Sequence, residues 1–135
     1  YPDNACVGSM YVEALLNTNP WKHWDLTTGL PSEPAVKARN ILSRLLQLHP
    51  YHPGLNHFNI HLLEMSPYPE EALPSCDVLR YNCVPDAGHL IHMPSHIYIL
   101  LGMYDDAAQC NIEAIRADEK YHIKAGNMNY YTGYR

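Results

Sequence analysis

The sequence predicts an all-α protein in which antiparallel helix pairs stack into an α-solenoid. Proline and glycine divide the chain of 135 residues into segments of about helix length. The alternation of β-branched and polar residues that marks a strand is almost absent. The sequence also repeats with a period of 35 residues, the spacing of Pro50 and Pro85. A period of this size is typical of stacked helical units.

The first two helices are predicted at residues 5–17 and 33–48. In the first, apolar residues recur at helical spacing ahead of an Asn-Thr-Asn-Pro turn that ends the helix. In the second, Ser32 is placed to cap the helix, and Pro34 occupies the first turn, where a missing N–H is tolerated. The apolar stripes are Val7, Met10, Tyr11, Ala14 and Leu15 in the first helix and Val36, Ile41, Leu45 and Leu48 in the second.

Four further helices are predicted at residues 53–65, 69–81, 89–101 and 104–124. Pro94 falls inside the third of these. A proline there removes one backbone hydrogen bond and either bends the helix or makes it begin late. Because this position lies between His92 and His96, we expect the bend to set the separation of these two side chains.

Two consecutive units align at the period of 35 residues. Asn-His-Phe-Asn-Ile-His at residues 56–61 aligns with Ile-His-Met-Pro-Ser-His at residues 91–96. The length suits a single domain, and we expect one that covers residues 1–135. Its repeat units are predicted at about residues 18–52, 53–87 and 88–122. The chain starts at Tyr1 rather than Met and ends in an aromatic run, so we expect it to be a segment of a longer protein.

The last unit resembles the tetratricopeptide repeat (TPR) family at the positions that define it. Gly102 and Tyr104 stand at the turn between its helices, followed by Ala107 and Ala114, as in the family's Gly-x-Tyr-x-x-Ala pattern with a later alanine. Pro67 replaces the glycine in the preceding unit, which is a degenerate copy. The strings HPGLNHFNIHLLE and GHLIHMPSHIYILLGMYDDA are similar to a histidine-rich subgroup of bacterial and environmental TPR proteins. The resemblance implies a fold but no activity.

Histidines occupy equivalent positions in the two units. Counted from Pro53 and Gly88, histidines stand at positions five and nine of both units, with one more at position two and a glutamate at position twelve. In TPR proteins, these positions of the first helix face a concave groove. The resemblance therefore implies that six residues share one surface. They are His57, His61, Glu64, His89, His92 and His96.

This pattern suits a metal site. Histidines at i and i+4 lie about 5–6 Å apart at Cβ on one helical face, so each pair can bring two imidazoles to one ion. We expect the pairs of both helices to converge on a single ion, with Glu64 or His89 as a further ligand or as a partner that orients one. Imidazole and carboxylate donors favour zinc or copper, and less strongly nickel or iron, over calcium.

Other interpretations are consistent with the same residues. Duplication of one repeat could copy a structural histidine pair that packs or hydrogen-bonds in the groove floor, or the histidines could contact an anionic ligand or peptide. The chain could accordingly be a scaffold module that binds a peptide or protein partner in its groove. It could also self-associate through the end faces of the repeat array.

Several classes of protein are disfavoured. The formal net charge of −5 argues against a nucleic-acid partner, and no apolar run reaches the ~18 residues of a membrane span. The sequence has no HExxH, phosphate-binding glycine loop or Gly-x-Ser-x-Gly elbow, so it indicates no nucleotide or organic cofactor and assigns no enzyme activity. The four cysteines form no CxxC motif, and we expect buried thiols. A Cys76–Cys83 disulfide would require a helix end between them.

Overall fold

The computed structural model describes residues 1–125, with the backbone alone at Asn82 and Cys83. Over this range the regular structure is helical, apart from one isolated antiparallel bridge between Trp24 and Pro31. The all-α prediction is confirmed. No helix of the described residues has the length and apolarity to cross a membrane. The end of the predicted domain, residues 126–135, lies outside the described range.

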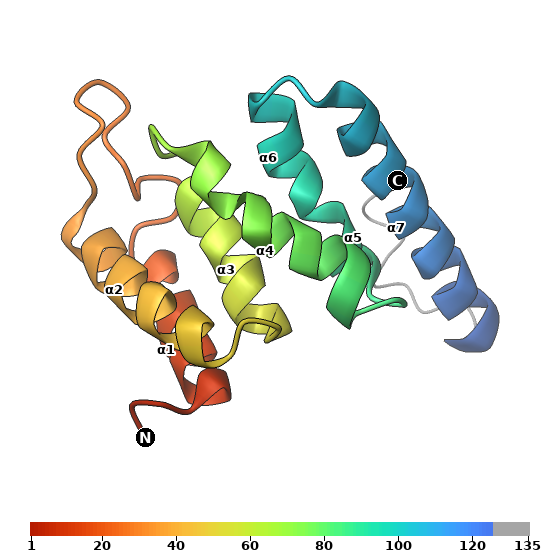
Figure 1. The fold of residues 1–135 in the computed structure, drawn as a ribbon, viewed down its shortest axis with the longest axis horizontal. Coiled ribbons are helices and arrows are strands. Elements are labelled where there is room, and N and C mark those ends of the chain that lie inside the picture. Colours follow the sequence, from red (N-terminus) through yellow and green to blue (C-terminus); the bar gives the residue numbers. More distant parts are fainter. Residues whose placement is uncertain (126–135) are drawn as a thin grey trace.

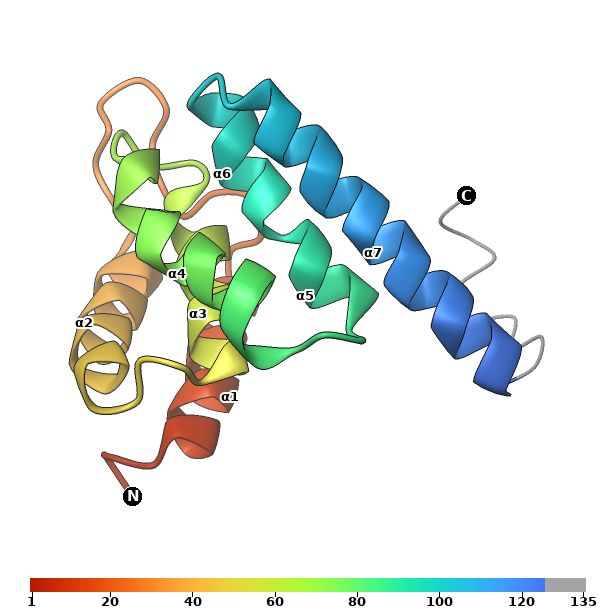
Figure 2. The ribbon, with the colours of Figure 1, turned by 45° about the vertical axis from the view of Figure 1, so that its right-hand side comes forward.

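The helices follow one another in layers along the chain (Figure 1). α1 packs on α2, α3 contacts α1, α2 and α4, and α7 packs along both α5 and α6, as Figure 2 also shows. The elements are α1 (Ala5–Asn17), α2 (Glu33–Leu48), α3 (Pro53–Leu63), η1 (Pro69–Ala72), α4 (Leu73–Val78), η2 (Leu79–Cys83), α5 (Gly88–His92), α6 (Pro94–Leu100) and α7 (Tyr104–Ala125).

Helix bounds match the sequence prediction where the helices are regular and depart from it at prolines. α1 and α2 coincide with their predicted segments, with Asn4 and Ser32 as side-chain caps. The predicted helix at 69–81 is instead a 3-10 turn, a short α-helix and a π-helix. Pro74 in the first turn of α4 has no N–H to continue the preceding turn, so the α-helix starts only at Leu73.

The predicted break at Pro94 is confirmed. α5 ends at His92 and α6 begins at Pro94. Met93 between them keeps helical dihedrals (φ −51°, ψ −39°), so the chain continues in the same direction after the lost hydrogen bond. His92 and His96 therefore stay on one side of the broken helix.

Element starts recur at the predicted period. α3 begins at Pro53 and α5 at Gly88, and η1 begins at Pro69 and α7 at Tyr104. Both intervals are 35 residues. In the predicted unit 18–52 the only helix is α2, because residues 18–32 form turns.

The buried faces of α1 and α2 differ from the predicted stripes. Val7, Met10 and Tyr11 are about half exposed or more, and the buried apolar residues of α1 are Val12 and Leu16. On α2, the buried set is Ala35, Ala38, Leu42 and Leu45, which shares only Leu45 with the prediction. The reason is close packing at small residues. A Cβ at Gly8 of α1 would lie only 2.1 Å from Leu45 Cδ1, so the glycine lets the two helices approach.

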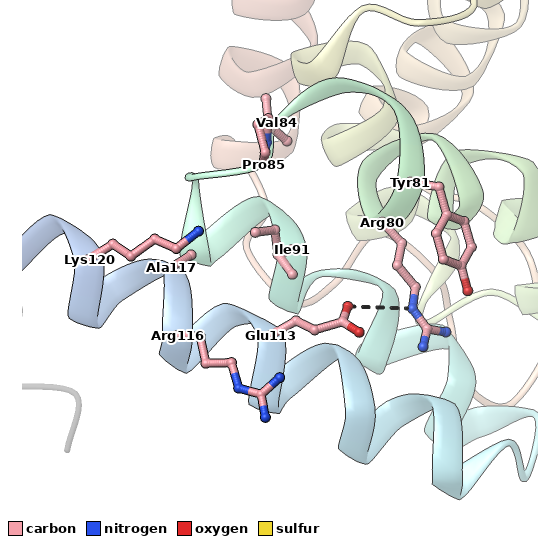
Figure 3. A pocket seen from close by; sticks show the side chains of 9 residues that line it. All are labelled: Arg80, Tyr81, Val84, Pro85, Ile91, Glu113, Arg116, Ala117 and Lys120. Atoms are coloured by element: carbon pink, nitrogen blue, oxygen red, sulfur yellow. Dashed lines mark ion pairs between the residues drawn. The ribbon is translucent and has the colours of Figure 1, made fainter.

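Arg80 of η2 faces two carboxylates of α7, and Figure 3 shows its ion pair with Glu113. Its guanidinium is 2.8 Å from Asp106 Oδ1 and 3.8 Å from Glu113 Oε2, while the side chain is only 7% exposed. The guanidinium also lies over the rings of Tyr81 and Tyr98, at 5.0 and 5.7 Å from their centroids. These contacts link η2 to α6 and α7.

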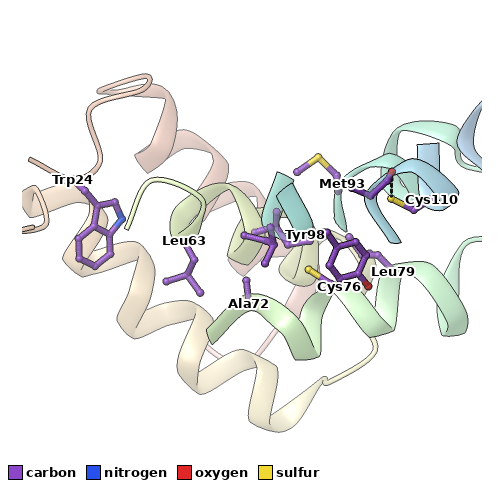
Figure 4. Packing of buried hydrophobic residues seen from close by; sticks show 11 residues of the cluster. Trp24, Leu63, Ala72, Cys76, Leu79, Met93, Tyr98 and Cys110 are labelled. Atoms are coloured by element: carbon purple, nitrogen blue, oxygen red, sulfur yellow. Dashed lines mark hydrogen bonds between the residues drawn. The ribbon is translucent and has the colours of Figure 1, made fainter. Parts of the chain in front are cut away.

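The main core lies where α3, η1 and α4 pack against α6 and α7 (Figure 4). Its buried members are Trp24, Ile60, Leu63, Ala72, Cys76, Leu79, Met93, Ile97, Tyr98, Ala107 and Cys110. Each large apolar side chain buried here stabilises the fold by about 1.5–3 kcal/mol. Cys76 and Cys110 are free buried thiols, as predicted, and burial raises the pKa of Cys76 to about 12. The prediction is wrong for Cys6, which is exposed near the start of α1. A Cys76–Cys83 disulfide is absent because the helical backbone runs through both residues and the Cys76 thiol is free.

Candidate metal centre

The structure brings the six predicted site residues together. His57 and His61 lie on α3, which ends just before Glu64, and the remaining three histidines lie on α5 and α6. Neighbouring imidazole rings are 4.7 to 6.3 Å apart, centroid to centroid. We call the five rings the histidine cluster. Its members are His57, His61, His89, His92 and His96.

Three of these histidines are close enough to hold one ion. The ligand nitrogens of His57, His61 and His89 all lie within 4.8 Å of one another, and we call these residues the triad. The Nε2 atoms of His57 and His89 are 3.1 Å apart. Two nitrogens on a tetrahedral zinc ion are about 3.3 Å apart, given a Zn–N bond of about 2.0–2.1 Å. The group that is close enough to hold an ion is therefore an i, i+4 pair together with the first histidine of the next unit.

Glu64 lies between the two halves of the cluster. Its Oε1 accepts a hydrogen bond from His61 Nδ1 at 2.9 Å, and its Oε2 accepts one from His96 Nδ1. Burial acts to raise the pKa of Glu64, but the hydrogen bonds from both histidines outweigh it and hold the pKa at about 2. With each oxygen bonded to an imidazole, the carboxylate orients the rings and directs their Nε2 atoms away from itself.

Burial keeps two members of the triad neutral. Desolvation, followed by the neighbouring imidazoles, lowers the pKa of His57 to about 3. The same causes lower the pKa of His89, although Asp118 opposes them. Since a metal binds only the deprotonated imidazole, these rings are available as ligands at neutral pH.

His92 and His96 form a second group, which we call the pair. Their Nε2 atoms are 3.0 Å apart, and their ring centroids 4.9 Å. His92 Nδ1 is 2.6 Å from Oδ1 of Asn111 on α7. Nothing in the sequence pattern pointed to Asn111, which becomes a neighbour only when α7 packs against α5 and α6.

A pocket of about 290 Å³ adjoins the triad. It is lined by Glu13, Leu16, Asn17, Pro20, Trp21, His23, His57, Phe58, His61 and Glu64. Trp21 is 67% exposed and has a positive φ of 60°, which is rare for a bulky residue.

His23 is a site residue that the sequence interpretation missed. It is only 7% exposed, and its Nδ1 is buried without a hydrogen-bond partner among the described residues. Burial lowers its pKa, with Glu64 opposing the shift and His61 adding to it. Its neighbour Trp24 donates from Nε1 to the Leu62 carbonyl at 2.7 Å and anchors the loop on α3. Trp24, which is buried, was the sequence signal that this part of the loop packs inward.

A larger pocket of about 570 Å³ lies at η2, α5 and α7 (Figure 3). Two of the three cations that line it, Arg80 and Lys120, have counter-charges close by. Arg80 faces Asp106 and Glu113, and Lys120 Nζ is 3.4 Å from Asp86 Oδ1. This pocket contains no histidine, and we do not assign it to the metal chemistry.

Comparison with protein-family models, curated proteins and solved structures gives no match to this chain. The geometry of the site is therefore what indicates a function for this chain.

Proposed function

We propose that the protein binds a transition-metal ion, zinc or copper, through His57, His61 and His89. The observation that carries the proposal is the convergence of three imidazole nitrogens within 4.8 Å of one another. A carboxylate bonded to His61 Nδ1 supports it, because metal-bound histidines commonly donate their second ring nitrogen to such an acceptor.

The donor set favours zinc or copper. All three ligand atoms are imidazole nitrogens, which suit these metals better than magnesium or calcium. Three protein ligands leave a fourth tetrahedral position for water or a small ligand. The pocket lined by His57 and His61 provides space for it.

We further propose that the chain is a TPR-like solenoid and that the metal lies between two of its repeats. Support comes from the 35-residue intervals between element starts and from Gly102, whose φ of 74° suits the turn before α7. Binding of a peptide or protein partner in the groove, and self-association, stay predictions from the sequence.

The test is metal content together with thermal unfolding. The protein is equilibrated with zinc or copper, dialysed and analysed by inductively coupled plasma mass spectrometry, and its melting is followed by circular dichroism with and without chelator. At 100 times its dissociation constant, an ion bound only by the folded state adds about 2.7 kcal/mol to the free energy of unfolding.

A matched variant separates a ligand role from a structural one. In His61→Asn, the amide nitrogen takes about the place of Nδ1 and can still donate to Glu64, but Nε2 is lost. We expect this variant to keep its helicity and lose affinity for the metal. The control is His49→Gln, since His49 lies outside the cluster and bonds the Asp3 carbonyl. Absence of bound metal in the wild type, with an unchanged melting temperature, would refute the proposal.

A further inference from the structure

The protonation of His92 follows from the orientation of Asn111. The Asn111 amide nitrogen donates to the Ala107 carbonyl at 2.8 Å, so its Oδ1 is the atom that faces His92. An amide oxygen only accepts, and the 2.6 Å contact therefore requires a proton on His92 Nδ1. The Ser95 hydroxyl is 3.4 Å from the same nitrogen, a longer and weaker contact.

The protonation of His96 follows from Glu64. An ionised carboxylate has no proton to give, so its bond with His96 Nδ1 requires the proton on that nitrogen. In both rings Nδ1 carries the hydrogen, and in the neutral ring Nε2 carries a lone pair.

The two lone pairs consequently face each other. The Nε2 atoms of His92 and His96 are 3.0 Å apart, and two acceptors at this distance form no hydrogen bond. A cation shared between them relieves the repulsion. Their separation is close to the roughly 3.3 Å between neighbouring nitrogens on a tetrahedral zinc ion.

The two rings of the pair lie closer to each other, with centroids 4.9 Å apart, than to the rings of the triad. The ring centroids of His61 and His96 are 5.8 Å apart, and those of His89 and His92 are 6.3 Å apart. Glu64 connects the two groups because it gives one oxygen to each. The side chain of His96 is 26% exposed, so an ion has access to the pair.

We infer that His92 and His96 form a second metal position of the same zinc or copper class, coupled to the triad through Glu64. The centre then holds two ions. This inference extends the proposed function, from which it takes the class of ion, but it depends on separate ligands. Asn111 serves as a positioning residue that fixes the ring of His92.

The test is the stoichiometry of zinc binding to the full chain after equilibrium dialysis. We expect two equivalents in the wild type and one in His92→Asn and in His96→Asn. Each variant keeps a donor at the Nδ1 position, for Asn111 and Glu64 respectively, and removes Nε2. His57→Asn should leave the pair intact and also bind one tight equivalent. Should either pair variant fail to fold, the other gives the same test.

Copper provides a second measurement. Two copper(II) ions held in one cluster should give a spin–spin coupled electron paramagnetic resonance signal in the wild type, and His92→Asn should convert it to that of an isolated ion.

Each alternative result has a separate meaning. One zinc equivalent in the wild type that His92→Asn leaves unchanged would show that a shared proton joins the pair, and would overturn the second position alone. Loss of that single equivalent in His92→Asn would place one ion among all five histidines and also overturn it. No binding in any form of the protein would overturn the proposed function as well.

Discussion

The pocket beside α7 and the pocket beside α3 are both lined by ionisable side chains, yet these side chains are partnered differently. In the first, Arg80 and Lys120 each face a carboxylate, although Arg80 Nε lies 3.8 Å from Glu113 and makes no hydrogen bond among the described residues. In the second, His61 faces the Glu64 carboxylate, but His57 faces a further imidazole, that of His89 at 3.1 Å, and His23 Nδ1 has no hydrogen-bond partner among the described residues.

The first pocket contains pairs of opposite charges, whereas the second contains a contact between two groups of the same kind. Opposite charges close to each other stabilise the fold without any further component. The contact between His57 and His89 needs a proton on one of the two Nε2 atoms, or a cation between them, and a buried nitrogen without a partner costs about 1–3 kcal/mol. In the proposed function, a bound ion would supply that cation.

The largest expected effect is that of pH on the metal-free protein. His57 has a pKa of about 3 when folded and an ordinary value near 6.5 when unfolded. Below pH 6.5 the unfolded chain binds a proton that the folded chain does not, so the free energy of unfolding falls as pH falls. This group contributes up to about 1.4 kcal/mol per pH unit until the folded pKa is reached, and nothing above pH 6.5. Urea titrations in chelator from pH 7 to 4 measure the slope.

His57→Asn removes this titrating group. The variant should have a shallower dependence of stability on pH than the wild type, by the slope assigned to one proton. An identical slope in both proteins would show that His57 is not held neutral by its surroundings.

The second effect concerns the carboxylate that orients both halves of the cluster. Glu64→Gln replaces one accepting oxygen by an NH₂ group, which cannot accept from a histidine Nδ1–H. We expect metal affinity to fall about 10–100-fold, the usual cost of losing such a partner. Titration with a competing chelator measures it. Glu13→Gln, in the wall of the same pocket, is the control and should bind as the wild type does.

The third effect tests the charge-paired pocket. Arg80→Met leaves Asp106 without its cation and should lower the free energy of unfolding by about 1.5 kcal/mol, with metal content unchanged. Arg116→Met, an exposed cation in the same wall, should stay within about 0.5 kcal/mol of the wild type. A change in metal stoichiometry in Arg80→Met would show that the two pockets are not independent.

The smallest effect concerns the unpartnered nitrogen of His23. In the metal-free protein, His23→Phe removes a buried nitrogen without a partner and should raise the free energy of unfolding by about 1 kcal/mol. His52→Phe should act in the opposite direction, because His52 Nδ1 accepts from Leu55 N and caps α3. If His23→Phe instead destabilises the protein, His23 Nδ1 has a partner in solution.

Local signals in the sequence were sufficient for the helices themselves. Caps such as Ser32 and the prolines at 53 and 94 act within one turn of the backbone, so helix starts and the break in the fifth predicted helix could be located without a structure. The i, i+4 histidine pairs are also a local property, since helical geometry alone places them on one face.

The faces that become buried were not predictable in this way. Tyr11 and Val36 have the right spacing but point outward, because α1 and α2 meet where Gly8 allows close approach. Burial depends on which surface a neighbouring helix covers, and helical periodicity does not contain that information.

The sequence by itself therefore determined the all-α class, the positions of the regular helices and the presence of histidines on the first helix of each of the two aligned units. Only the tertiary structure decided which imidazoles meet, that Glu64 lies between His61 and His96, that Asn111 contacts His92, and that His23 lines the pocket beside the histidine cluster. The physical reason is range. Hydrogen bonds and ion coordination act over a few ångströms, and residues far apart in sequence reach that distance only once the helices have packed.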